Sequence, residues 1–403
     1  MLRYEIKKVF SKSKNRMAVI VLFVILVITS VLTINKVEYV DEKGNHFVGI
    51  SAARDLREAK NEWKGYLTED TLSKALEENR TINNSKEALS DDITEQNKAY
   101  AKKQGIVSII DVISQAFSEY RDYNYYAADN VSDDEVGAIY ERRISALKEW
   151  FDSGEETFTQ EEKDFMIQKY EDLETPFYYE YMDGWAALLQ NISTFILILA
   201  LVIGFFVSGI FSDEFQAKAD SIFFSTRFGR SRGISAKVGA GFCITTGFYV
   251  IFVLLYTFIV LFVLGVDGAN CPIQLDLWRS VYNITFLQAY LFIVLGGYIG
   301  TIFAATLGML ASAFTHSTPT AVIVPFIVLC AFPFLSRIIT LPGLCSFFPD
   351  QLLEIYLDIK EAGLITLGSK VTTIATVIVP VYAVVCLIFQ PILYRVYQKV
   401  EIK

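Results

Sequence analysis

Long runs without a single charged residue set the strongest limit on how this chain folds. Residues 184–212, 238–266 and 280–336 contain no Asp, Glu, Lys or Arg. A membrane-spanning helix needs about 20 consecutive apolar residues. The first two runs are each long enough for one crossing, and the third is too long for one. With 53% hydrophobic residues among 403, the sequence predicts an all-α polytopic membrane protein.

Six transmembrane helices account for the apolar segments. The run at 280–336 holds two of them, because polar residues and a helix-starting proline at Thr315–Pro319 give a turn between them. The second of these helices, helix five, also contains Pro325 and Pro333, so we expect it to be kinked or broken. Residues 337–370 then return outside with a short interfacial helix or a partial re-entry. The remaining spans are expected at 17–34, 186–210, 238–264 and 371–394.

The segment between the first two spans, residues 35–183, is expected to form a domain of its own outside the membrane. It holds 18 Lys and Arg against 34 Asp and Glu, whereas the rest of the chain holds 18 against 11. Thr159–Glu162 matches a helix-starting capping box, and residues 105–120 have an amphipathic helical pattern. We therefore expect a mostly helical, acidic, extracellular domain. Its closing aromatic residues at 177–181, with Trp185, are interpreted as a belt at the membrane surface, with a substrate platform as the alternative.

A charged island at residues 212–237 separates the spans at 186–210 and 238–264. Its apolar residues recur at helical spacing, which predicts one face of a short amphipathic helix. Its cations favour a cytoplasmic position. The phenylalanines then either dock on a partner protein or lie on the lipid interface. The apolar stripe consists of Phe211, Phe215, Ala219, Ile222 and Phe223, and the cations that follow it are Arg227, Arg230, Arg232 and Lys237.

The N-terminal residues 1–16 read as an amphipathic helix in the cytoplasmic interface. Four lysines, at positions 7, 8, 12 and 14, are expected to face anionic lipid headgroups. The alternative is the basic region of a signal peptide. Residues 17–34 are longer than a usual signal core and lack a small-residue cleavage pattern, so they are interpreted as transmembrane helix one. Both termini are therefore expected in the cytoplasm, since an even number of spans returns the chain to the same side.

Several classes of chemistry lack their residues in this sequence. Two histidines, His46 and His316, cannot build a His-based metal cage, so no metal site is expected. The chain has no GxxxxGK[ST] or HExxH motif, and its cations border membrane spans instead of forming a nucleic-acid surface. Cys271 and Cys345 both fall in segments expected outside, where they either form a disulfide or remain thiols.

The expected spans carry no ionisable residue near the middle of the membrane. A proton- or ion-coupled carrier would place one there, so secondary transport is disfavoured and an uncharged route is expected. Glycines at 296, 297 and 300 are interpreted as close helix-packing positions. The polar residues available to line a translocation path are Asn191, Thr194, Gln288, Tyr298 and Thr301.

The layout resembles the permease subunits of type-2 ABC exporters, whose Gram-positive members often carry a large outer insert after helix one. The likeness runs through Met182–Trp185, Glu214, Ser225–Arg230 and Lys237, and shorter likenesses lie at Leu307–Ser312 and Phe347–Pro349. One departure is Ala217–Asp220, where family members often have Gly-Thr. The residues that the resemblance and the amphipathic pattern assign to ATPase coupling are Glu214, Phe215, Ile222, Phe223, Arg227, Arg230 and Lys237.

The resemblance implies a permease subunit that works as a dimer, identical or mixed, beside a separate cytoplasmic ATPase. That ATPase would bind ATP and magnesium, and this chain would hold no cofactor. An uncharged path suits a hydrophobic drug, an antimicrobial peptide or a lipid-like compound. The alternative is a membrane sensor or immunity protein whose outer domain binds a cationic peptide without transport. The sequence leaves the cargo and the direction of transport open.

Overall fold

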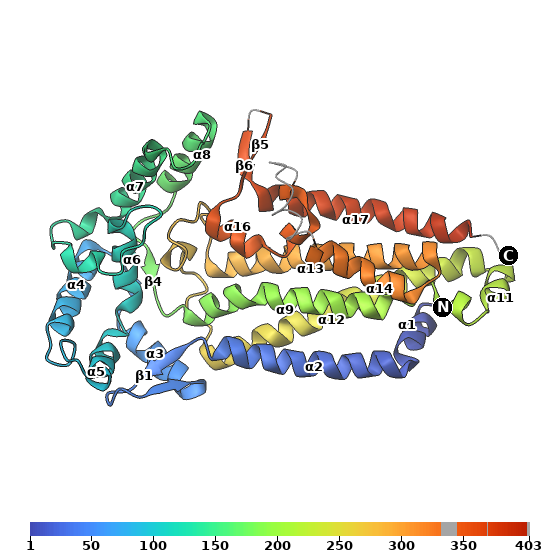
Figure 1. The fold of residues 1–403 in the computed structure, drawn as a ribbon, viewed down its shortest axis with the longest axis horizontal. Helices are drawn as coiled ribbons and strands as arrows, with labels where there is room; N and C mark the ends of the chain where they lie inside the picture. The colour runs from blue at the N-terminus through green and yellow to red at the C-terminus, as the bar shows by residue number, and fades with distance from the viewer. Residues whose placement is uncertain (332–344, 369, 401–403) are drawn as a thin grey trace.

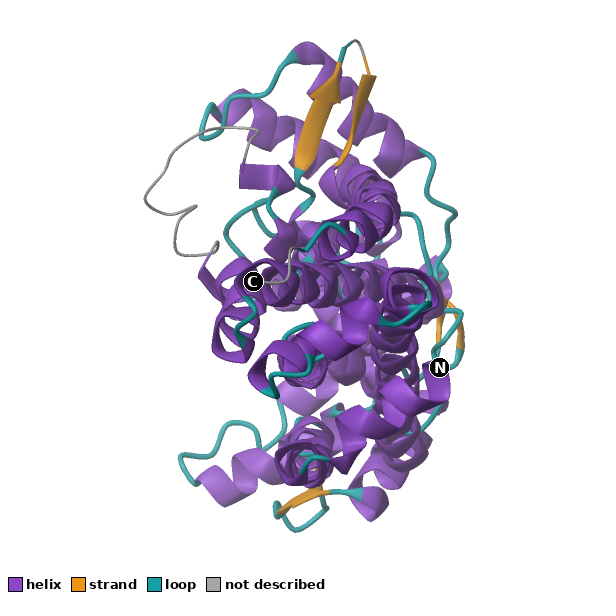
Figure 2. Cartoon of the chain, turned by 90° about the vertical axis from the view of Figure 1, so that its right-hand side faces the viewer, coloured by secondary structure: helices purple, strands orange, loops and turns teal. Residues whose placement is uncertain are grey.

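The computed structural model describes residues 1–331, 345–368 and 370–400. A bundle of long helices carries a smaller domain at one end, and both termini lie at the other (Figure 1). We call these the domain end and the loop end. Figure 2 looks at the bundle from the loop end, with the long helices seen along their axes. The architecture confirms an all-α polytopic membrane protein.

Five of the described helices are long and apolar enough to cross a membrane. Their bounds lie within four residues of the expected spans at most ends. A sixth apolar helix, α14 (Thr318–Phe326), continues into a π-helical turn, Ile327–Ala331, with Pro325 inside it; this is the broken geometry expected of helix five, and Pro333 lies outside the described residues. The five long helices are α2 (Ser13–Ile34), α9 (Asp183–Val207), α12 (Ile234–Leu264), α13 (Phe286–Thr315) and α17 (Ile374–Gln398).

The chain before α17 forms a hairpin that the sequence analysis missed. Strand β5 (Leu364–Leu367) pairs antiparallel with β6 (Lys370–Thr373), so the helix begins at Ile374 and not at residue 371. Gly368 in the connecting turn has φ +65°, and Val-Thr-Thr is a β-branched run that suits a strand. The expected interfacial helix before the hairpin is α16 (Ile355–Glu361), preceded by the short turns Cys345–Phe347 and Pro349–Leu352.

Glycines in α13 let neighbouring segments approach closely, as the sequence predicted. A Cβ atom at Gly296 would lie 1.9 Å from Ile355, and one at Gly297 would lie 2.8 Å from Ile196 of α9. Side chains at these positions would therefore push α13 away from both partners.

The outer domain between α2 and α9 is mostly helical, with two small hairpins. The predicted capping box is present at the start of α8: Thr159 and Glu162 each bond the other's backbone. The amphipathic segment at 105–120 forms α6, which is buried along one face. The helices are α3 (Ile50–Asn61), α4 (Glu69–Asn83), α5 (Ile93–Lys103), α6 (Val107–Phe117), α7 (Ile139–Ser153) and α8 (Gln160–Glu171), with short 3-10 turns at Ala127–Asn130 and Val136–Ala138. The hairpins pair β1 (Glu38–Val40) with β2 (His46–Val48), and β3 (Gly65–Tyr66) with β4 (Tyr178–Tyr179).

The aromatic residues at 177–181 do not form a belt facing lipid headgroups. Phe177, Tyr179 and Tyr181 are at most 1% exposed. Strand β4 holds this segment against β3, and the Phe177 ring packs edge-on against Tyr140 at 5.0 Å. These residues are core of the outer domain because strand pairing turns their side chains inward.

A buried arginine joins the outer domain to the loop that connects α12 and α13, which contains the 3-10 turn Ile273–Leu275. Arg143 on α7 is 3% exposed. Its guanidinium donates to the carbonyl oxygens of Trp278, at 3.0 Å, and Ser280, at 2.8 Å, and lies 3.5 Å above the Tyr170 ring. Each buried carbonyl oxygen needs a donor, so this one side chain fixes the loop beneath the domain.

Replacing Arg143 with Met should loosen this joint. The Trp278 carbonyl would lose its Arg143 donor, at a cost of about 1–3 kcal/mol, and the Ser280 carbonyl would keep only the longer bond from Gln274, at 3.3 Å. We expect faster hydrogen exchange and proteolysis in residues 267–285, measured on the full chain in detergent. Arg142→Met is the matched control, because Arg142 lies beside it on α7 and its contacts, a long ion pair with Glu149 at 3.5 Å and a cation–π contact with Phe117 at 5.9 Å, stay within the outer domain. Equal protection in both variants would contradict this role for Arg143.

Candidate functional site

The charged island at residues 212–237 folds back on the loop end of the bundle as two short helices, not one. Helix α10 (Asp213–Gln216) ends at Lys218, which adopts a left-handed conformation with φ +54°. The Lys218 N–H donates to the Phe215 carbonyl at 3.1 Å and the Ala219 N–H to the Glu214 carbonyl at 2.8 Å. These two bonds form a Schellman motif, which ends a helix.

Helix α11 (Asp220–Ser225) follows the Schellman motif, and a π-helical turn at Gly229–Gly233 leads into α12. The expected continuous stripe from 211 to 223 is therefore wrong. The apolar residues keep their helical spacing through Ala217–Asp220, but the backbone reverses within this segment. These are the residues that stand where family members often have Gly-Thr.

A buried ion pair joins α10 to α12. The Lys237 ammonium is fully buried and lies 2.8 Å from both carboxylate oxygens of Glu214. It also donates to the Ile210 carbonyl at 2.7 Å, and Glu5 lies 3.3 Å away. The Lys237 charge is therefore enclosed within protein, with a partner for each of its N–H groups.

The N-terminal helix α1 (Leu2–Ser11) and the residue after it supply two more cations to the acidic residues of α10. Lys8 lies 2.5 Å from Glu214, and Lys12 pairs with Asp213. Val9 on the same helix is buried. The expectation that all four lysines of residues 1–16 face lipid headgroups is therefore wrong for these two. We call Lys8, Lys12, Asp213, Glu214 and Lys237 the ion cluster.

The ion cluster keeps Glu214 charged although the carboxyl is buried. Burial opposes its ionisation, but the Lys237 and Lys8 ammonium groups outweigh that effect and hold the Glu214 pKa below its usual value of 4.5. For Lys8, burial is again the opposing influence, and the hydrogen bond and charge of Glu214 raise its pKa above 10.5. Glu214 and Lys8 therefore both carry their charges across the neutral range.

Two phenylalanines expected on a docking face are used inside the protein. Phe215 stacks on His316, which follows α13, with ring centroids 3.6 Å apart. Phe223 is half-buried beneath the Lys237 ammonium, 5.3 Å from its ring centre. Ile222 is different, because its side chain is 68% exposed. The stripe alone could not tell these positions apart, because their packing partners are distant in sequence.

The arginines of the loop also have two different environments. Arg230 donates to the backbone carbonyls of Gln398 and Val400, at 2.7 and 3.0 Å, and so attaches the loop to the end of α17. Arg227 and Arg232 are exposed, and each guanidinium lies over the Phe228 ring. We call Ile222, Arg227, Phe228 and Arg232 the exposed face.

Most of the polar residues expected along a translocation path form hydrogen bonds with nearby groups of the protein. Thr301 is buried and donates to the Gly297 carbonyl at 2.7 Å, and Asn191 donates to Ala187 at 2.8 Å, each within its own helix. Tyr298 pairs with Thr246 at 2.9 Å, and Gln288 caps the start of α13 through Thr285. Thr194 is exposed on α9. A path role for these five residues remains a prediction.

Cys271 is a buried free thiol, so it forms no disulfide with Cys345 in this structure. Its sulfur lies 4.0 Å from the Glu180 carbonyl, and burial raises its pKa to about 12. A thiol with this pKa stays protonated and unreactive at neutral pH.

One family model covers the outer domain, residues 212–237 and four of the five long helices, and it ends before α17. The family model for ABC-2 family transporter proteins matches residues 16–355, which is most of the chain. The chain belongs to this family. Neither the curated proteins nor the solved structures contain a match. ABC-2 proteins are multi-pass permease subunits that in general work with an ABC ATPase and dimerise, so this permease carries the membrane part of a transporter.

Sequence reasoning missed several partners of the ion cluster. Lys8 and Lys12 were interpreted only as interfacial cations, and no pairing was expected for Asp213. Tyr397 near the C-terminus is fully buried against Phe211, with ring centroids 4.7 Å apart. The one available signal was charge balance, since acidic residues at 213 and 214 face a segment of opposite charge at the same membrane side.

Replacing Glu214 with Gln should destabilise the permease strongly. It leaves the Lys237 ammonium buried without its main counter-ion, at a cost of about 3–5 kcal/mol. We expect a lower unfolding temperature in detergent. Asp220→Asn is the control, because it removes the same charge from the same loop outside the ion cluster.

The difference between wild type and Glu214→Gln should also depend on pH. Because the Glu214 pKa is lowered on folding, its stabilisation is present above the unfolded value of 4.5 and is lost as pH falls through the folded pKa. Because folding raises the Lys8 pKa, the stabilisation that Lys8 provides is present at lower pH and is lost only as pH rises above 10.5. Unfolding temperatures at about pH 3, 5 and 7 measure this. A difference that is unchanged at acidic pH would contradict the assigned charge state.

Proposed function

We propose that this chain is the permease subunit of an ATP-driven exporter and that the exposed face of residues 212–237 binds a separate ATPase. The observation that supports the proposal is that one part of this loop is buried against the bundle and another part is exposed. Its charged and aromatic interior is fixed to the bundle by the ion cluster, while Ile222 and Phe228 are left 68% and 37% exposed. An exposed aliphatic side chain and an aromatic ring covered by two arginines suit a docking surface for a cytoplasmic protein.

The attachment of the loop gives a physical route for coupling. Helix α10 follows α9 and reaches α12 through Lys237 and α1 through Lys8. Ser212 bonds Thr318 at the start of α14 at 2.8 Å, and Arg230 holds the end of α17. A force on the exposed face would therefore act on several helices together, as rigid-body motion of packed elements requires.

We also propose that the loop end lies in the cytoplasm and residues 35–183 lie outside the cell. The cations on the exposed face support this orientation through the positive-inside preference. ATP and magnesium would be bound by the ATPase, and a second permease subunit, identical or related, would complete the path. The cargo class that fits an uncharged route is a hydrophobic drug, an antimicrobial peptide or a lipid-like compound.

Ile222→Asp tests the docking assignment. A charge at the centre of a contact patch should weaken association with the ATPase by at least about tenfold, measured by co-purification of the two subunits from membranes. The permease itself should remain folded, because Ile222 contacts solvent. Leu89→Asp, at an outer-domain side chain that is 72% exposed, is the matched control. Unchanged association of Ile222→Asp would remove the exposed face as the docking surface.

A further inference from the structure

The 3-10 turn Pro349–Leu352, which precedes α16, lies inside the bundle and not on its end. A Cβ atom at Gly300 of α13 would lie 3.2 Å from the Leu352 side chain. Because a helix rises 1.5 Å per residue, Gly300 is about 21 Å from the first residue of α13. Tyr382, about 12 Å along α17, donates its hydroxyl to the Phe347 carbonyl at 2.8 Å. The hydrocarbon of a membrane is about 30 Å thick, so this turn lies at membrane depth.

The turn carries a carboxyl group that protein encloses. Asp350 is 2% exposed, and its Oδ1 atom has no hydrogen-bond partner. Its Oδ2 atom accepts one long bond, at 3.3 Å, from the side-chain amide of Gln351. The other donors beside it are the backbone N–H groups of residues 350 and 351. An ionised carboxylate enclosed in this way is costly, whereas a protonated one is not.

No cation compensates Asp350 among the residues that the structure describes. The turn packs against α13, α17 and the π-helical turn after α14. Residues 280–336, which include α13 and that π-helical turn, hold no charged side chain. The one charged residue of α17, Arg395, is about 20 Å along the helix from Tyr382, which faces Asp350. The other titratable groups at this depth are a phenol and two thiols, uncharged at neutral pH: Tyr298, Cys330 and Cys386.

Three more carboxyl groups follow Asp350 along the chain, and their exposure increases in order. Glu354 and Asp358 are half-buried, and Glu361 is exposed. The Gln351 amide bridges the first two groups, since it lies 3.3 Å from Asp350 and 3.2 Å from Glu354. Asp358 accepts from the Tyr282 hydroxyl and from the Ala375 N–H. The segment therefore carries a line of carboxyl groups from the bundle interior to its surface.

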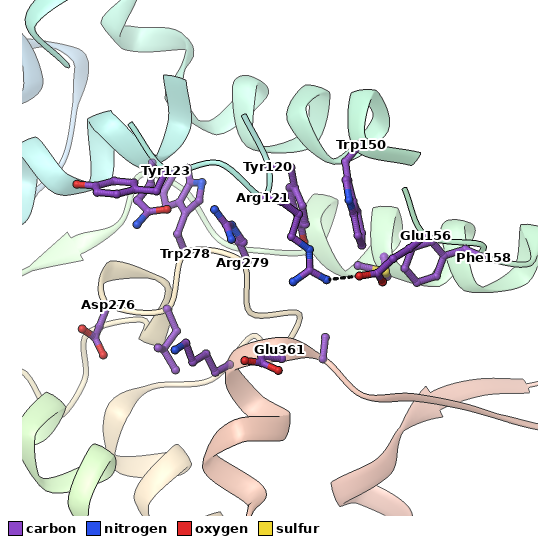
Figure 3. A pocket seen from close by; sticks show the side chains of 15 residues that line it. Tyr120, Arg121, Tyr123, Trp150, Glu156, Phe158, Asp276, Trp278, Arg279 and Glu361 are labelled. Carbon is purple, nitrogen blue, oxygen red and sulfur yellow. Dashed lines mark hydrogen bonds and ion pairs between the residues drawn. The ribbon is translucent and has the colours of Figure 1, made fainter. Parts of the chain in front are cut away.

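The exposed end of this line opens into a cavity beneath the outer domain. Glu361 lines this cavity, which has a volume of about 440 Å³. Figure 3 shows Glu361 there, with the ion pair of Arg121 and Glu156 on the opposite wall and the exposed Asp276 nearby. Polar and charged side chains of this kind hold water. A proton that leaves the line at Glu361 therefore enters water at the domain end.

We propose that Asp350 is a proton-binding site inside the bundle and that Glu354, Asp358 and Glu361 connect it to water at the domain end. In the packed arrangement the carboxyl oxygen keeps its proton; on release, the proton passes to water and a carboxylate remains. Ionisable groups at membrane depth mark proton pathways in other membrane proteins. This site goes beyond the proposed function, and proton binding needs no ATPase, so the two proposals fail or succeed separately.

Infrared spectroscopy of the full chain in lipid nanodiscs tests the site, because a protonated carboxylic acid has a C=O stretching band that a carboxylate lacks. At neutral pH we expect such a band in wild type and its loss in Asp350→Asn, whose side chain has nearly the same shape. Asp350→Glu should shift the band without removing it. Asp134→Asn, at an exposed acidic residue of the outer domain, should match wild type. No band in wild type, or one that survives in Asp350→Asn, would overturn the proposal.

Transfer to heavy water tests the connecting groups, because deuterium exchange shifts the same band at a measurable rate. Glu354→Gln should keep the band and slow the exchange by about tenfold or more, since a positioned carboxylate speeds proton transfer. Glu361→Gln repeats the test at the exposed end, where no packing is disturbed. Unfolding temperatures show that both variants are folded. Exchange as fast as wild type in both variants would contradict this route.

Discussion

The loop end of this permease depends on a lysine ammonium that has been removed entirely from water. Enclosing a charge costs several kcal/mol unless every hydrogen-bonding group finds a partner. Lys237 meets this condition through the two carboxylate oxygens of Glu214 and the Ile210 carbonyl. Because these groups come from α12, α10 and the segment after α9, the ion pair is satisfied in only one arrangement of three elements. The loop is therefore a fixed part of the bundle.

Helices α9 and α12, which the ion pair links at the loop end, are also joined at the domain end. Trp185, in the first turn of α9, donates from its indole to the Val266 carbonyl after α12, at 3.0 Å. Asp183 begins α9 with an ion pair to Lys60 of the outer domain. With contacts at both ends, α9 and α12 are expected to move as a unit.

The sequence predicted the membrane architecture well because that part depends on one simple quantity, the length of charge-free apolar runs. The capping box at Thr159 and the glycine packing of α13 were also predictable, since both follow from local rules. The ion cluster was not, because Lys8 and Glu214 are 206 positions apart. Helical periodicity also failed at Lys218, where a backbone reversal that no spacing records turned Phe215 inward and left Ile222 in solvent.

We propose that the exposed face meets an ATPase while the ion cluster holds the loop on the bundle. Photo-crosslinking is a direct test, with a benzophenone amino acid placed at position 222 of the full chain in membranes that also contain the ATPase. We expect a crosslinked product with the ATPase from position 222 and none from position 66, an exposed tyrosine of the outer domain. No product from position 222, or equal products from both positions, would contradict it.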